Sequence, residues 1–183
     1  MNRSAHCTRR HLLRRGAEAA AIGTLALLGP RARAAGVRSL AMVHTHTGER
    51  IDVVYAVDEH YEADALAALN RFLRDHYTGE IGRIDPRVFD QLHRAQRLAG
   101  SQRPFEVISG YRCAATNAQL RATRGGGVAR ASLHVEGRAI DVRLPGVELA
   151  ELRDAALSLR AGGVGYYPRE RFVHLDSGRV RSW

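Results

Sequence analysis

The sequence predicts an α+β domain with a small, mainly antiparallel sheet, flanked by helices and preceded by an N-terminal β-hairpin. Short β-prone runs stand at both ends of the region 39–176, and the segments between them carry apolar residues at helical spacing. The order of hairpin, two helices, strand, helix, strand, helix and final strands is typical of this class. A chain of 183 residues with 45% hydrophobic residues has room for one domain with a core of its own.

The hairpin is predicted from two β-prone runs, 39–46 and 50–57, on either side of a short turn that contains Gly48. Two helices follow it. The first covers 61–76, through which Leu66, Leu69 and Leu73 recur as an apolar stripe. The second covers 86–98 and has strong end signals, namely Asp85 and Pro86 at its start and Gly100 after its end.

Four of the nine histidines, at positions 44, 46, 76 and 93, fall on the predicted hairpin and the two helices that follow it. His44 and His46 fall on one face of the first β-prone run, and two histidines at that spacing can bind a metal. No third ligand stands near them in the sequence, so a role in shaping the hairpin is favoured. His76 and His93, on the predicted helices, are interpreted as surface or capping residues.

The next elements are a short buried strand over 105–108, a helix over 115–124 and an amphipathic helix over 147–160. Arg112 follows the strand, at a junction between strand and loop that commonly carries site residues. Glycines 125–127 are interpreted as a flexible link. They are not a phosphate-binding loop, because that loop ends in Gly-Lys-Ser/Thr and this chain contains no lysine.

Three residues in the second half suggest a metal site. Residues 139–143 alternate, so that Ile140 and Val142 face the core and Asp141 faces away from it. Residues 172–176 alternate in the same way and present His174. With His134, in a loop just before the first strand, the chain offers two imidazoles and one carboxylate. Such a set binds zinc and leaves a fourth position open for water, as in catalytic sites.

These residues stand in a longer pattern. Ser132-x-His134-x-x-Gly137-x-Ala139-x-Asp141, preceded by Ser109-Gly110-Tyr111-Arg112 and followed by Val173-His174-x-Asp176, resembles the zinc D-Ala-D-Ala metallopeptidase superfamily, which includes lysostaphin-type enzymes and hedgehog domains. It is most similar to the YcbK-like branch of murein endopeptidases. The resemblance covers about residues 38–183 and includes His46-Thr47-Gly48-Glu49.

The resemblance implies one zinc ion per chain on His134, Asp141 and His174, in a peptidase that acts on peptide stems of peptidoglycan. It also implies that the Arg112 guanidinium binds a substrate carboxylate or the carbonyl oxygen under attack, rather than forming a surface salt bridge.

The general base is the point at which the chain departs from the superfamily pattern. An acid often stands three residues before the last zinc histidine, and here that position is Arg171. Asp176, two residues after His174 and on the same strand face, is the favoured base. It could equally accept a hydrogen bond from a ligand imidazole and fix its tautomer. Glu170 is the other candidate base.

The N-terminal segment carries an export signal. Arg9 and Arg10 form a twin-arginine pattern, an apolar stretch over 17–28 follows, and Ala32-Arg33-Ala34 resembles a cleavage site. We expect residues 1–34 to be a twin-arginine signal peptide and 35–183 to be a zinc peptidase domain in the periplasm. An uncleaved membrane anchor is the alternative, although the apolar stretch is short for a bilayer.

Charge and cysteine content agree with export. The net charge of +9 would suggest a nucleic-acid partner, but removal of residues 1–34 takes away seven arginines and one glutamate and leaves about +3. We therefore expect no nucleic-acid partner and no stable membrane insertion. Cleavage also removes Cys7, so Cys113 has no disulfide partner and is interpreted as a buried, inert thiol rather than a nucleophile.

The leading hypothesis is a periplasmic murein endopeptidase. A carboxypeptidase that trims a terminal D-amino acid is the alternative among enzymes. A zinc-containing, non-catalytic cell-wall-binding domain is the alternative from another class, because hedgehog-like relatives use this fold for binding.

Overall fold

The computed structural model describes residues 36–123 and 129–183, all of which fall within one compact unit, Arg33–Trp183. The predicted signal peptide, with Cys7, and glycines 125–127 lie outside the described residues. Within the described part of the chain, no helix is long and apolar enough to cross a membrane.

Eight strands form one sheet in the order β3-β2-β1-β4-β5-β7-β6-β8. Their bounds are β1 Val37–His44, β2 Arg50–Val57, β3 His60–Tyr61, β4 Phe105–Ser109, β5 Ala139–Arg143, β6 Gly163–Tyr167, β7 Phe172–Asp176 and β8 Arg181–Ser182. The four described helices are α1 Ala63–Phe72, α2 Pro86–Leu98, α3 Ala114–Thr123 and α4 Leu149–Ser158. The α+β class is therefore confirmed.

The sheet is larger and more mixed than predicted. Most neighbouring strands are antiparallel, including the predicted hairpin of β1 and β2. However, β1 pairs in parallel with β4, and β6 pairs in parallel with β8. The sequence pattern missed β3 and β8 because strands of two residues show no alternation. It missed the β1–β4 pairing because α1 and α2 separate these strands along the chain.

The helix ends follow the local signals closely. The Asp85 carboxylate accepts a hydrogen bond from the backbone N–H of Arg87 at 3.0 Å, which caps α2 as predicted. Gly100, just beyond the last turn, has a φ of +63°. α1 ends earlier than predicted, at Phe72, so His76 lies in the loop that follows rather than on the helix.

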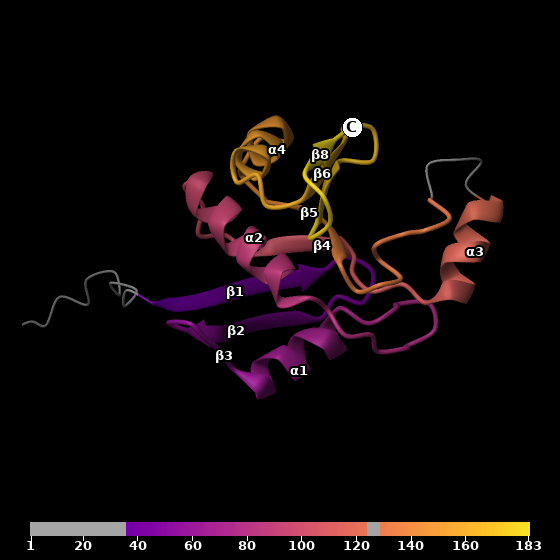
Figure 1. Cartoon of the computed structure of the whole chain (residues 1–183), viewed down its shortest axis with the longest axis horizontal. Helices are drawn as coiled ribbons and strands as arrows, with labels where there is room; N and C mark the ends of the chain where they lie inside the picture. Colours follow the sequence, from indigo (N-terminus) through magenta and orange to yellow (C-terminus); the bar gives the residue numbers. More distant parts are fainter. Residues whose placement is uncertain (1–35, 124–128) are drawn as a thin grey trace, which may run out of the picture. The chain divides into compact units, whose positions relative to one another are not determined.

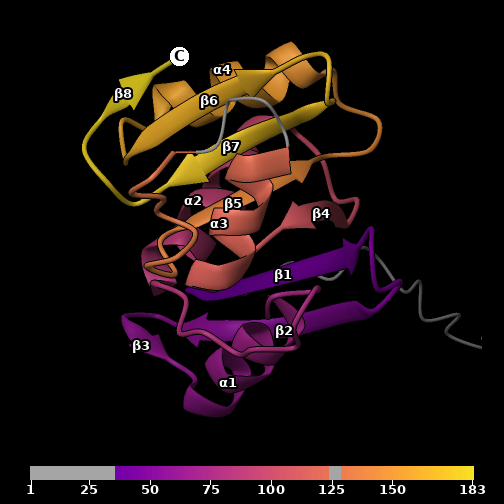
Figure 2. The same cartoon turned by 90° about the vertical axis from the view of Figure 1, so that its right-hand side faces the viewer.

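The hydrophobic core lies between the sheet and helices α1, α2 and α4. Its fully buried members include Leu40, Leu69, Phe89, Leu92, Ile140, Leu152 and Val173. Helices α2 and α4 lie on one side of the sheet, while α3 lies on the other side and contributes none of these core residues (Figures 1 and 2). The sheet face on the side of α3 is therefore the face that does not pack against the core helices α2 and α4.

Two predictions about single residues have clear outcomes. His93 was expected at the surface or in a cap, but it is 5% exposed, and its Nδ1 lies 3.2 Å from the carbonyl oxygen of Ser39. This expectation was wrong because α2 packs on β1 over this part of its length. Cys113 is a buried free thiol, in agreement with the structural interpretation.

Candidate metal centre

Strand register brings two of the three predicted ligands together. β5 and β7 are antiparallel neighbours in which Asp141 pairs directly with His174. Residues at the intervening positions, Ile140 and Val173 among them, are buried in the core. Since side chains alternate along a strand, Asp141 and His174 both project from the opposite face of the sheet.

The third ligand comes from a tight loop before β5. Within this loop the N–H of Gly137 donates to the carbonyl oxygen of His134, and the N–H of Arg138 donates to that of Leu133. Gly137 has a φ of +67°, and a Cβ at this position would lie 2.0 Å from the carbonyl oxygen of Arg83. The glycine is therefore required both by the backbone conformation and by the close approach of a neighbouring segment.

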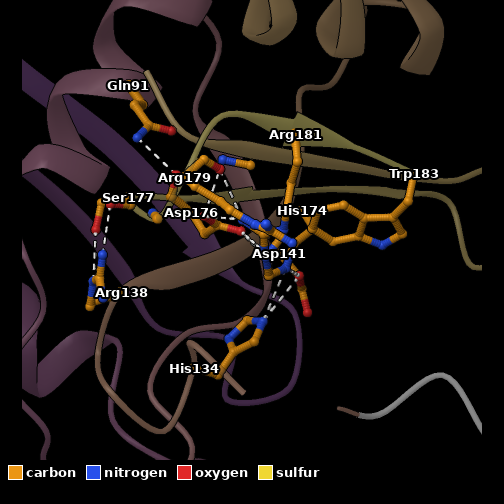
Figure 3. Close-up of polar contacts among 12 residues, drawn as sticks. Gln91, His134, Arg138, Asp141, His174, Asp176, Ser177, Arg179, Arg181 and Trp183 are labelled. Atoms are coloured by element: carbon orange, nitrogen blue, oxygen red, sulfur yellow. Dashed lines mark hydrogen bonds and ion pairs between the residues drawn. The ribbon is translucent and has the colours of Figure 1, made fainter. Parts of the chain in front are cut away.

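The three side chains converge on one point (Figure 3). Asp141 Oδ1 lies 2.8 Å from His174 Nδ1 and 3.3 Å from His134 Nε2, and the two imidazole nitrogens are 3.3 Å apart. One ligand atom from each residue lies within 4.8 Å of the others, and this is the one such group of three found in the described residues. His134 and Asp141 are buried, and His174 is 9% exposed.

Hydrogen bonds on the outer sides of the rings fix how the imidazoles can act. Nδ1 of His134 lies 2.7 Å from the carbonyl oxygen of Gly110, which only accepts, so this nitrogen carries the proton. Nε2 of His174 lies 3.2 Å from Asp176 Oδ2 and donates to it in the same way. The lone pair of the other nitrogen in each ring is then directed at the shared point. The donor set therefore fits a metal ion.

Without a metal, a proton occupies part of this cluster. Burial lowers the pKa of His174, but its hydrogen bonds to Asp141 and Asp176 outweigh burial and raise that pKa to about 9. Burial also lowers the pKa of His134, against the attraction of Asp141. Burial opposes ionisation of Asp141, yet the two imidazoles hold its pKa far below the usual range. Metal binding here would displace a proton from His174.

The contacts of Asp176 favour the orienting role over the role of base. Asp176 is fully buried, and both carboxylate oxygens are engaged. Oδ1 accepts from the backbone N–H groups of Gly163 and Gly178, and Oδ2 from Arg181 at 2.7 Å as well as from His174. These donors hold the pKa of Asp176 well below its usual range despite burial. A buried carboxylate on the outer side of a ligand ring holds that ring in place.

The other candidate base lies away from the site. Glu170 is exposed in the turn between β6 and β7 and is absent from the residues that line the pocket above the predicted metal ligands. This geometry gives no support to a catalytic role for Glu170.

Arg112 lies beside the predicted ligands. Its Nη2 is 3.7 Å from Asp141 Oδ2, and it also donates to Ser109 Oγ at 3.2 Å. The backbone N–H of Arg112 donates to the carbonyl oxygen of His134, which fixes the start of the arginine against the ligand loop. The side chain is 13% exposed and lines the pocket, so its guanidinium can face a bound substrate.

The pocket also has an aromatic wall that the sequence did not indicate. Trp183 packs against His174, with 5.3 Å between ring centroids and 52° between ring planes, and its Nε1 donates to the Tyr167 hydroxyl at 2.7 Å. Tyr167 stacks in turn on Phe172 at 4.5 Å. Trp183 reaches the site because β8 pairs with β6. The sequence did not indicate this pairing, because β8 is too short to show an alternating pattern.

Two imidazoles and one carboxylate that converge in a pocket open to solvent are a donor set that could hold a single metal ion, as in metal-dependent hydrolases. The family model described as "Peptidoglycan L,D-endopeptidase MepK" matches residues 32–183. The chain belongs to this family of peptidoglycan endopeptidases, which are metal-dependent peptidases. The resemblance inferred from the motifs is thereby confirmed.

Individual relatives agree with the family model. The chain is 49% identical over 146 residues to the peptidoglycan L,D-endopeptidase MepK of Escherichia coli K12, covering 80% of each protein. The protein of the same name from Shigella flexneri is equally similar. A probable peptidoglycan L,D-endopeptidase MepK from Haemophilus influenzae is 40% identical over 147 residues, covering 80% of this chain and 78% of the relative. No solved structure matches the chain.

These relatives favour the endopeptidase hypothesis over both alternatives. None of the relatives named above is described as a carboxypeptidase or as a non-catalytic wall-binding protein.

Proposed function

We propose that this protein hydrolyses L,D peptide bonds in the cross-linked peptide stems of peptidoglycan, with one zinc ion held by His134, Asp141 and His174. The convergence of these three ligand atoms within 4.8 Å carries the proposal. The names of the relatives supply the bond type. The family match spans residues 32–183 and therefore includes all three proposed ligands.

Zinc is favoured by the chemistry of the donors. Two neutral imidazoles and one carboxylate are a common catalytic set for this ion, with three protein ligands and one open position. When bound, zinc supplies Lewis acidity toward the scissile carbonyl group and toward the attacking water. The pocket lies directly over the ligands, so a peptide can approach them from solvent.

Arg112 is proposed to bind the oxygen that becomes negative as the carbonyl is attacked. A guanidinium beside the metal site is suited to this, because it stays charged at any working pH and donates several hydrogen bonds in a fixed plane. The hydrogen bond to Ser109 and the proximity to Asp141 support the assignment, since they hold the side chain at the edge of the pocket.

Asp176 is proposed as a positioning residue. Its hydrogen bond to Nε2 of His174 keeps the Nδ1 lone pair directed at the metal position. Arg181 and two backbone N–H groups hold the carboxylate in turn. The chain of contacts therefore runs from Arg181 through Asp176 to the ligand ring, which restricts the rotation of that ring.

The site of action is proposed to be the periplasm, reached through the twin-arginine pathway. The paired Arg9 and Arg10 and the Ala32-Arg33-Ala34 sequence support this route. A substrate in the cell wall requires an exported enzyme, so the family assignment and the leader sequence agree.

The test is digestion of purified sacculi by the mature domain, with and without a chelator, followed by separation of the released muropeptides. Chelator-sensitive loss of L,D-cross-linked dimers is expected. Shortened stems on intact dimers would instead indicate a carboxypeptidase. Unchanged sacculi with zinc demonstrably bound would favour a binding domain.

A further inference from the structure

A second hollow adjoins the metal pocket. It shares Arg112, Asp141 and Phe172 with that pocket and continues to His46 and His76. We refer to it as the histidine hollow. An extended substrate that crosses the metal ligands would therefore have room on two sides, one toward the aromatic wall and one toward these histidines.

The two histidines are held in a fixed arrangement. The rings of His46 and His76 are stacked with 4.2 Å between centroids and an angle of 3° between planes. Two more rings pack against His76, with centroid distances of 5.5 Å for His44 and 4.2 Å for Tyr77. Both imidazoles line the hollow, and an imidazole N–H is a hydrogen-bond donor.

Buried Asp75 ties the loop that carries His76 to the segment that carries Arg112. Its Oδ1 accepts from the backbone N–H of Tyr77 at 2.9 Å, and its Oδ2 accepts from that of Cys113 at 2.9 Å. Cys113 directly follows Arg112 in the chain. The two sides of the hollow are thus joined through one carboxylate, so their spacing is fixed before substrate arrives.

The hairpin turn is fixed to the same loop. Arg74 donates two hydrogen bonds to the Glu49 carboxylate, at 2.8 and 3.0 Å. Glu49 belongs to the turn that carries His46, and Arg74 precedes His76 by two residues. This pair brings the two histidines together and also neutralises the acid in the turn.

The lining of the hollow is rich in donors and poor in negative charge. Among its described lining residues, Asp141 is the one carboxylate, and it is a proposed metal ligand. Arg112, His46 and His76 can all carry positive charge. Such surroundings favour an anion.

We propose that the histidine hollow, through His46 and His76, binds a carboxylate of the peptide that flanks the scissile bond. This rests on the proposed function, since it places the scissile bond at the metal ligands. Imidazole N–H groups can donate hydrogen bonds to a carboxylate, and these bonds are stronger when the imidazole is charged. The hollow thereby selects peptides with an acid group at one fixed distance from the metal.

The experiment compares two probes, an L,D-cross-linked stem-peptide dimer and the same dimer with its carboxylates converted to carboxamides. His46→Gln and His76→Gln are compared with wild type, each zinc-loaded. The matched control is His60→Gln, an exposed histidine on the edge strand β3. KM and kcat are measured, together with the Kd of the released stem peptide by calorimetry and the zinc content.

We expect each variant to raise KM for the acid dimer, and Kd for the acid stem, by about tenfold, the loss typical of one hydrogen bond to a charged group. The kcat should change less than about threefold. The carboxamide dimer should bind more weakly to wild type and respond little to either substitution. His60→Gln should match wild type. Thermal unfolding checks that each variant is folded. If His76→Gln does not fold, His46→Gln still tests the proposal, because His46 is exposed in its turn.

Several results would overturn the proposal. Variants that cleave and bind as His60→Gln does would show that the hollow takes no part. A fall in kcat at unchanged KM and Kd would assign the histidines to catalysis, and loss of zinc would assign them to the metal. Failure of the proposed function would look different. In that case the folded, zinc-loaded wild-type protein would bind the acid stem but cleave no dimer.

Discussion

Asp176 Oδ2 lies 3.2 Å from Nε2 of His174, while Nδ1 of the same ring lies 2.8 Å from Asp141. The imidazole is thus held between the buried carboxylate of Asp176 on its outer side and Asp141, a proposed metal ligand, on its inner side. Because Asp176 contacts a proposed ligand ring, its role as general base and its role in orienting that ring predict different effects of the same substitution.

Asp176→Asn should weaken zinc affinity by roughly 10- to 100-fold, because the charged acceptor of His174 Nε2 is lost. Excess zinc should then restore much of the muropeptide release. Activity measured across a zinc titration checks this, with Asp154→Asn on the exposed face of α4 as the matched control. Normal zinc affinity with activity reduced by roughly 10²- to 10⁴-fold would reinstate Asp176 as the base.

Zinc should bind at about one ion per mature chain and should be lost in His134→Ala, Asp141→Ala and His174→Ala. Three protein ligands leave too few contacts once one is removed. Metal analysis of the purified proteins provides the measurement. His46→Ala is the control and should keep its zinc, whereas full zinc occupancy in His174→Ala would contradict the ligand set.

Arg112→Gln should retain zinc and lower kcat by roughly 10²- to 10³-fold, the usual effect of removing a donor to the developing oxyanion. Arg112→Lys should recover part of this loss because it keeps the charge but not the planar geometry. Steady-state kinetics on a cross-linked dimer checks both. A change in KM alone would mean that Arg112 binds the substrate carboxylate without acting on the oxyanion.

Acid should destabilise the fold partly through His44, which is fully buried and has a pKa lowered to about 4. The unfolded chain takes up this proton near pH 6.5 and the folded protein near pH 4, so stability present above pH 6.5 is lost as the pH falls to 4. His44→Gln lacks this loss. The difference in free energy of unfolding between His44→Gln and wild type should therefore shift in favour of the variant as the pH falls from 7 to 4. The expected shift is on the order of 1–3 kcal/mol.

Denaturant unfolding of both proteins at several pH values between 4 and 7 measures this difference. A gap between wild type and His44→Gln that stays constant over this range would contradict the prediction.

Export should depend on the paired arginines. Arg9→Lys combined with Arg10→Lys should leave the precursor in the cytoplasm, because the twin-arginine pathway reads this pair. Cell fractionation with immunodetection measures the distribution. Arg14→Lys combined with Arg15→Lys makes the same change outside the pair and should leave export intact. Normal periplasmic amounts of the first variant would mean that another route is used.

The sequence by itself determined the elements whose causes are local. Asp85, Pro86 and Gly100 fixed the ends of α2, and alternation over 139–143 and 172–176 indicated both strands that carry ligands. It also indicated His134, Asp141 and His174 as candidate metal ligands, because imidazole and carboxylate groups are ordinary zinc donors. These features depend on backbone propensity and side-chain type, which are written in short segments.

Only the tertiary structure decided which residues meet. The pairing of Asp141 with His174, the parallel β1–β4 contact and the approach of Trp183 through β8 depend on strand register across long stretches of chain. The same is true of Asp176. The alternating pattern placed it on the strand face of His174, but it did not show that Asp176 is buried or that it accepts a hydrogen bond from Nε2 of His174. Side-chain periodicity gives the face on which a residue lies, whereas packing of distant segments determines its partners and its protonation.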